Sequence, residues 1–163
     1  MTRARLENLT ASLLDAKLDA VILNPGPTLT YLTGIQFHLM ERPVVLFVAP
    51  GKDPVLVLPE LELPKVDLFP YKVQAFAYGE LPSEWDDAFR KAAKFLSLDG
   101  KRIGVEPRQL RLLEFRHVKA GAPEADFPVA SEALAQLRLR KDKAEVDAMR
   151  RAVFRLVDTG LNR

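Results

Sequence analysis

Cysteine is absent from this chain of 163 residues, and histidine occurs only twice, at His38 and His117. The lack of cysteine excludes disulfide bonds, thiolate metal sites and thiol nucleophiles. The two histidines form no H-x-x-x-H or H-E-x-x-H pattern, so the sequence has no histidine pair that would bind zinc from one helix. A chain without cysteine is compatible with the reducing cytoplasm, and we expect a cytoplasmic protein.

Several other signatures are missing. The sequence contains no G-x-G-x-x-G or G-x-x-x-x-G-K-[ST] phosphate cradle and no G-x-S-x-G nucleophile elbow. Its longest apolar runs, such as residues 43–50, are too short to cross a bilayer, and the first residues lack the apolar run of a signal peptide. We therefore expect no membrane partner.

Neither sign of charge is in large excess, because the formal net charge is only +2. Basic residues do gather between Arg102 and Lys119 and between Arg138 and Arg155, but acidic or apolar residues are interleaved in both stretches. This pattern is typical of solvated helix faces. A nucleic-acid surface needs a denser basic stripe or stacking aromatics, so we expect no nucleic-acid partner.

What the chain does have is the composition of a globular domain, with 48% hydrophobic and 28% charged residues. Strand patterns alternate with helix patterns. Strands are predicted at residues 19–24, 72–77, 102–106 and 125–129, with a hairpin formed by residues 44–48 and 55–58. Helices are predicted at residues 2–17 and 108–119, and from Pro82 onward with Asp86 in a capping-box position. A short helix is predicted at residues 28–33, with Gly34 as its C-terminal cap. The fold class is therefore α/β, a mixed β-sheet flanked by helices.

The last part of the chain predicts a long amphipathic helix. Asp142 and Glu145 form a D-x-x-E variant of the capping box. One face of this helix is apolar: Ala148, Met149, Ala152, Val153, Leu156 and Val157. We expect this face to be buried, either on the preceding domain or against a partner outside the chain.

Two motifs in this order carry a resemblance. Leu137-Arg138, Lys141, Glu145-Val146, Met149-Arg150 and Ala152 resemble the junction of the prolidase, aminopeptidase P and creatinase family, and residues 31–35 (Tyr-Leu-Thr-Gly-Ile) resemble its "YLTGF" motif. The resemblance implies a ribonuclease-H-like, creatinase-type N-terminal domain at residues 1–136. Residues 137–163 would be the linker and first helix that lead to a catalytic domain missing from this chain.

In that family, two Asp, one His and two Glu bind a dinuclear divalent metal centre in the C-terminal domain. None of those motifs is present, so we assign no catalytic residue, no metal ligand and no cofactor to this chain, and we expect it to be inactive alone. The resemblance implies a domain of a metal-dependent Xaa-Pro dipeptidase or aminopeptidase P that forms a homodimer and shapes substrate access. Its partners would be its own catalytic domain and a second subunit.

The candidate site is the loop that follows the "YLTG" motif, with Gln36, His38 and Arg42. In related dimers this loop can approach the active site of the other subunit. The alternative is an ordinary solvated loop. Arg42 has the geometry to clamp a substrate carboxylate. For His117 we expect a helix C-terminus as partner, and for Tyr31 packing in the core or in an interface.

Three other functions remain open from the sequence. The same architecture occurs in stand-alone modules that bind protein partners, including histone-associated chaperones. A creatinase-like parent would share this layout and would act on creatine instead of proline peptides. A small α/β enzyme with an unrecognised site is the third, although no set of convergent titratable groups supports it.

Overall fold

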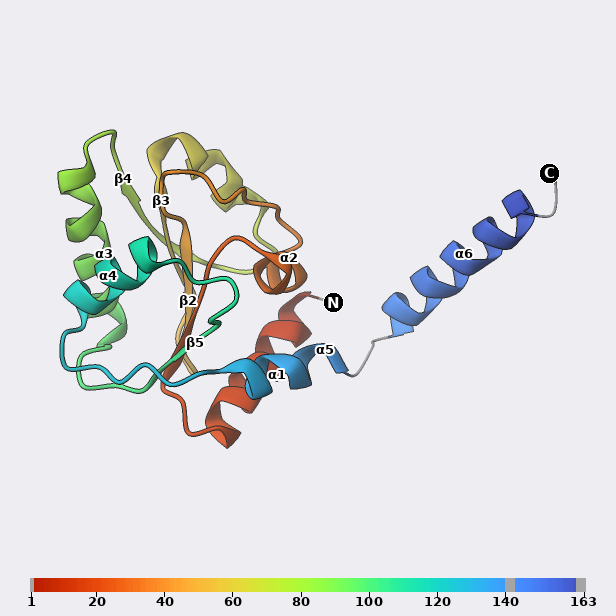
Figure 1. Cartoon of the computed structure of the whole chain (residues 1–163), viewed down its shortest axis with the longest axis horizontal. Helices are drawn as coiled ribbons and strands as arrows, with labels where there is room; N and C mark the ends of the chain where they lie inside the picture. Colours follow the sequence, from red (N-terminus) through yellow and green to blue (C-terminus); the bar gives the residue numbers. More distant parts are fainter. Residues whose placement is uncertain (1, 140–142, 161–163) are drawn as a thin grey trace.

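A computed structural model describes residues 2–139 and 143–160 (Figure 1). Its centre is a five-stranded sheet in the order β4-β3-β2-β1-β5. The strands are β1 (Ala20–Leu23), β2 (Val45–Val48), β3 (Val55–Pro59), β4 (Gln74–Tyr78) and β5 (Ile103–Val105). The pairs β1–β5 and β3–β4 are parallel, whereas β1–β2 and β2–β3 are antiparallel. The mixed sheet and the hairpin are both confirmed.

Helices cover both faces of this sheet (Figure 1). One face carries α3 (Pro82–Leu96) and α4 (Leu112–Gly121). The other carries α1 (Thr2–Asp15), α2 (Pro27–Thr33), α5 (Ser131–Leu139) and the 3₁₀ helix η1 (Glu60–Leu68). This three-layer arrangement is the predicted fold class.

The central strands are apolar at every position because both of their faces are buried. In β2, Val45 and Phe47 pack toward α3, while Leu46 and Val48 pack toward α1 and α2. Phe47 meets Phe89 of α3 edge to face, with ring centroids 6.3 Å apart. Each such fully buried side chain contributes about 1.5–3 kcal/mol relative to exposure, so these two apolar layers hold the domain together.

Two glycines are required by geometry. Gly34 ends α2 with φ +75°, and its N–H donates to the carbonyl of Thr30 at 2.7 Å, which is the predicted helix cap. Gly104 lies in β5 where a Cβ would come within 2.8 Å of the Cβ of Ala130 and 2.9 Å of Leu18 Cδ1. The segment that crosses β5 there therefore leaves no room for a side chain.

Three local predictions need correction. The helix predicted from residue 108 begins at Leu112, because residues 106–110 form a turn in which the N–H of Leu110 donates to the carbonyl of Glu106. Residues 125–129 lie beside β5 but form only isolated bridges, since Pro128 has no N–H to donate. The capping box at Asp86 is wrong: α3 starts at Pro82, with no side-chain cap.

The final helix, α6 (Lys143–Gly160), extends away from the body of the domain (Figure 1). Met149 is 57% exposed and Phe154 is 71% exposed. The prediction that this apolar face packs on the domain is therefore wrong for this chain. Burial of the face against a partner outside the chain stays a prediction. Asp142 and the side chains of Leu156 and Val157 lie outside the described residues. Within the part of the chain that the structure describes, no helix has both the length and the apolar character to span a bilayer.

Candidate functional site

The candidate loop, residues 35–44, joins α2 to β2 at one end of the sheet. Because β2 is antiparallel to β1 and β3, this is the end at which β1 and β3 finish. Strands β5 and β4 run parallel to these two and finish there as well. The loop therefore lies where four strands present their carboxyl ends, the edge at which open α/β sheets commonly bind ligands.

Three backbone carbonyls fasten this loop to the domain. The carbonyl of Gln36 accepts from Lys65 Nζ at 3.3 Å, that of Met40 from Arg111 Nη1 at 2.7 Å, and that of Pro43 from the hydroxyl of Tyr78 at 2.5 Å. The donors come from η1, from the residue before α4 and from β4. The loop is thus held from three separate elements while its middle faces solvent.

Arg111 is itself held by a buried carboxylate. Its Nε donates to both carboxylate oxygens of Glu114, at 2.9 and 3.1 Å, and its Nη2 also contacts this group. The side chain of Glu114 is 0% exposed, whereas that of Arg111 is 34% exposed. A buried carboxylate is stable only when paired and hydrogen-bonded. The pair therefore orients the guanidinium toward the carbonyl of Met40.

Tyr78 provides the other firm attachment. Its side chain is buried between β4 and α3, where its ring packs against Trp85 at 5.6 Å between centroids. Burial raises the pKa of the Tyr78 phenol well above its ordinary value, so the hydroxyl keeps its proton and remains a donor to Pro43.

The structure places the three candidate side chains on this loop in different ways. Gln36 and His38 are exposed, while Arg42 is half-buried. Arg42 forms a two-pronged ion pair with Glu80, with Nη1 at 2.9 Å from Oε1 and Nη2 in contact with Oε2. A substrate carboxylate would therefore compete with Glu80 for this guanidinium. The roles of all three residues stay predictions.

His117 differs from the prediction. It lies in the middle of α4, and its Nδ1 is 2.6 Å from Oδ1 of Asp86 on α3. Its ring stacks on Phe89 with centroids 5.2 Å apart. The expected contact with a helix C-terminus is wrong, because α4 continues for another turn and α3 supplies a closer carboxylate. His117 therefore joins two helices.

Tyr31 follows the prediction in part, since its half-buried ring packs against the core layer of α1 and α2. It also makes polar contacts with the start of α6, described below.

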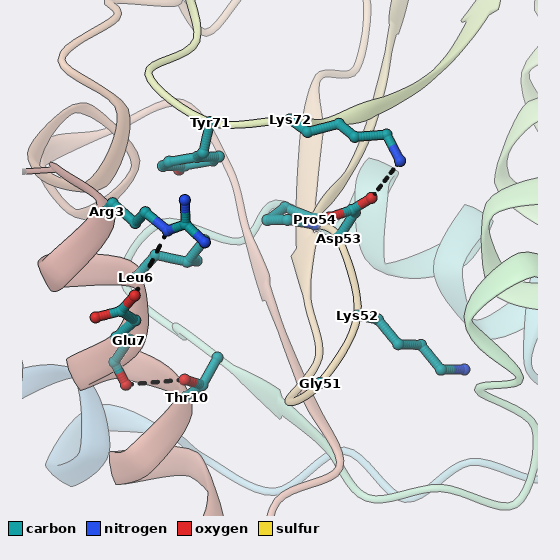
Figure 2. A pocket seen from close by; sticks show the side chains of 10 residues that line it. All are labelled: Arg3, Leu6, Glu7, Thr10, Gly51, Lys52, Asp53, Pro54, Tyr71 and Lys72. Atoms are coloured by element: carbon teal, nitrogen blue, oxygen red, sulfur yellow. Dashed lines mark hydrogen bonds and ion pairs between the residues drawn. The ribbon is translucent and has the colours of Figure 1, made fainter.

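A hollow of about 410 Å³ lies at the opposite end of the sheet, between α1 and the β2–β3 turn (Figure 2). Three cations line it, and each already has an acceptor within the domain. Arg3 lies 3.6 Å from Glu7, Lys72 lies 2.7 Å from Asp53, and Lys52 donates to the carbonyl of Leu96 at 2.7 Å. We give this hollow no part in the function proposed below.

The described residues contain no set of side chains that could bind a metal ion. Among residues 2–139 and 143–160, no three His, Asp or Glu side chains gather closely enough to hold an ion. These residues do not fit a dinuclear metal centre.

The sequence analysis missed the residues that hold the loop: Lys65, Tyr78, Glu80, Arg111 and Glu114. One signal was available, because Arg111 and Glu114 have the i, i+3 spacing of a helical ion pair. The partners Glu80 and Tyr78 lie more than 30 residues from Arg42 and Pro43, and no local pattern links such positions.

The mixed five-stranded sheet between two helical layers defines the protein as an α/β domain. More narrowly, the chain belongs to the creatinase/prolidase N-terminal domain family, whose match spans residues 5–140.

Individual relatives agree with this assignment. YkvY of Bacillus subtilis, which is named as a dipeptidase, is 26% identical over 157 residues, covering 96% of this chain and 43% of its own length. The dipeptidase of Pyrococcus horikoshii superposes with a TM-score of 0.79 and 26% identity, over 98% of this chain and 44% of that one. A proline dipeptidase structure from Streptococcus pneumoniae gives a TM-score of 0.71 and 27% identity, over 83% of this chain and 98% of that one. The chain spans about two fifths of the curated relatives it matches.

Proposed function

We propose that this chain is the non-catalytic N-terminal domain of a larger metal-dependent dipeptidase of the Xaa-Pro dipeptidase or aminopeptidase P type. The observation that carries the proposal is the family match over residues 5–140, together with relatives more than twice as long that are named as dipeptidases. The described residues gather no metal ligands of their own. On this proposal, the hydrolytic centre belongs to a part of the protein outside these 163 residues.

The proposed work of the domain is to pair two subunits and to narrow access to the active site. Support comes from the loop of residues 35–44, which is held at three carbonyls and exposes Gln36 and His38 at the carboxyl end of the sheet. A loop fixed in this way can present side chains to a second subunit without first being ordered, which lowers the entropic cost of contact. The substrate class would be short peptides that contain proline, as the name of the Streptococcus pneumoniae relative suggests.

Light scattering on this chain tests the subunit-pairing part. We expect a mass twice the 18.3 kDa of one chain at tens of micromolar protein. If the mass stays at 18.3 kDa up to millimolar concentration, the domain does not pair subunits by itself and this part of the proposal fails. If a dimer forms, replacing His38 by Ala should leave its mass unchanged, since this exposed side chain is proposed to act on substrate access.

A further inference from the structure

The two motifs that carry the family resemblance lie more than 100 residues apart in sequence, but they touch in space. Tyr31 comes from the first motif at α2, and Glu145 comes from the second at the start of α6. The hydroxyl of Tyr31 lies 3.4 Å from Oε2 of Glu145. Arg5 of α1 meets both residues. We propose that Arg5, Tyr31 and Glu145 form a joint that fixes the direction of α6 relative to the five-stranded domain.

The position of the Tyr31 hydroxyl is the first argument for this joint. The same oxygen lies 3.4 Å from the carbonyl of Leu137, in the last turn of α5. Carbonyls in the last turn of a helix have no partner within the helix and need an external donor. Tyr31 therefore contacts the end of α5 and the beginning of α6 with a single atom. Since a phenol has one proton, the two acceptors share it, and this couples the two helices.

The charge arrangement is the second argument. Arg5 Nη2 lies 3.5 Å from Oε1 of Glu145, with side chains only 12% and 25% exposed. Glu145 is in the first turn of α6, where the helix dipole already favours a negative group. The carboxylate thus faces an arginine, a phenol and a helix N-terminus together, which limits the directions that α6 can take.

Arg5 is in turn fixed by Tyr31. Its guanidinium lies over the ring of Tyr31, 3.9 Å from the centroid, and its Nη1 donates to the carbonyl of Tyr31 at 2.9 Å. A flat guanidinium can stack on an aromatic ring and donate in its own plane at the same time, which an ammonium group does not do. These contacts tie α1 and α2 to the joint, so two helices of the domain hold the first turn of α6.

A fixed joint explains how α6 can extend from the domain with an exposed apolar face and still have a defined direction (Figure 1). Whatever follows α6 in a longer protein would then be held at a set angle to the loop of residues 35–44. The joint consists of residues of this chain alone and does not depend on whether the longer protein is a peptidase.

Spin labels can measure this direction directly, because the absence of cysteine allows labelled cysteines to be introduced without background. Lys94→Cys on α3 and Arg151→Cys on α6 are both exposed sites. Pulsed electron resonance on the doubly labelled chain should give one narrow distance distribution. Tyr31→Phe removes only the hydroxyl and Glu145→Gln only the charge, so each should broaden the distribution at least twofold while circular dichroism shows the same helix content.

Matched controls separate the joint from general effects. Tyr71→Phe removes a hydroxyl that lies 3.5 Å from the carbonyl of Leu32 and does not reach α6. Asp147→Asn removes a carboxylate of α6 that pairs with Arg150 of the same helix at 3.6 Å. Both should keep the narrow distribution. The proposal is overturned if the unsubstituted chain already gives a broad distribution, or if Tyr31→Phe and Glu145→Gln leave it as narrow as the controls do.

Discussion

Replacing Arg111 by Ala should destabilise the folded domain strongly. The change deletes the guanidinium that donates to Glu114 at 2.9 and 3.1 Å and to the carbonyl of Met40 at 2.7 Å. The carboxylate of Glu114 would then be left at 0% exposure without its cation. The loop of residues 35–44 would lose one of its three carbonyl attachments at the same time.

The expected cost follows from the burial of this pair. Removing one partner of a buried ion pair costs about 3–5 kcal/mol because the remaining charge is uncompensated. Arg111 is one-third exposed, so water already screens part of the interaction and the lower end of that range, about 3 kcal/mol, applies. With a urea dependence of about 2 kcal/mol per molar, the unfolding midpoint should fall by about 1.5 M.

Urea unfolding followed by tryptophan fluorescence provides the assay. The only tryptophan, Trp85, packs against Tyr78 and His117 in the same region of the domain. Arg116→Ala on the exposed side of α4 is the control and should change stability by less than about 0.5 kcal/mol. Combining Arg111→Met with Glu114→Leu removes both charges and should recover most of the loss. A cost below about 1 kcal/mol for Arg111→Ala, the value of an exposed pair, would refute the reasoning.

Three further predictions concern other parts of the chain. Gly34→Ala should lower the free energy of unfolding, measured by thermal denaturation, by about 1–2 kcal/mol. This cost comes from the left-handed backbone (φ +75°) alone, because no atom within 4 Å would clash with the new Cβ, and Gly34→Asn should cost less. Burial raises the pKa of Tyr78, so the phenol stabilises the folded state fully at pH values below its ordinary pKa of about 10, and this contribution is lost as the pH rises further. The free energy of unfolding should therefore fall above about pH 10, and it should fall less steeply in the variant Tyr78→Phe. Phe154→Ser should leave the stability of this chain within about 0.5 kcal/mol, since the side chain is exposed, and a larger loss would mean that α6 packs on the domain after all.

The sheet could be predicted from the sequence because its strands are apolar on both faces. Residues 19–24, 44–48 and 55–58 carry short apolar runs bounded by turn residues, and each matches a strand of the structure to within one residue at either end. Gly34 was also a sound local signal, since a positive φ after a helix favours glycine. In these places local pattern and tertiary packing require the same residues.

The contacts that hold the loop could not be predicted, because they depend on pairs that are distant in sequence. The same limit applies to Asp86, whose position suggested a helix cap: α3 has no side-chain cap, and the carboxylate instead meets His117, 31 residues further on. The apolar face of α6 is a second case. The sequence pattern predicts a buried face that includes Met149 and Val153, but both side chains are more than half exposed in the structure, and no local pattern specifies what would cover them.

A peptidase assay on this chain tests the central claim most directly. Purified protein would be incubated with a series of Xaa-Pro dipeptides and with manganese, cobalt or zinc added in turn, with an active proline dipeptidase as a positive control. The account predicts no hydrolysis above buffer with any metal. Metal-dependent cleavage that follows the 18.3 kDa chain through size-exclusion chromatography would show that the chain holds its own catalytic centre and would contradict the account.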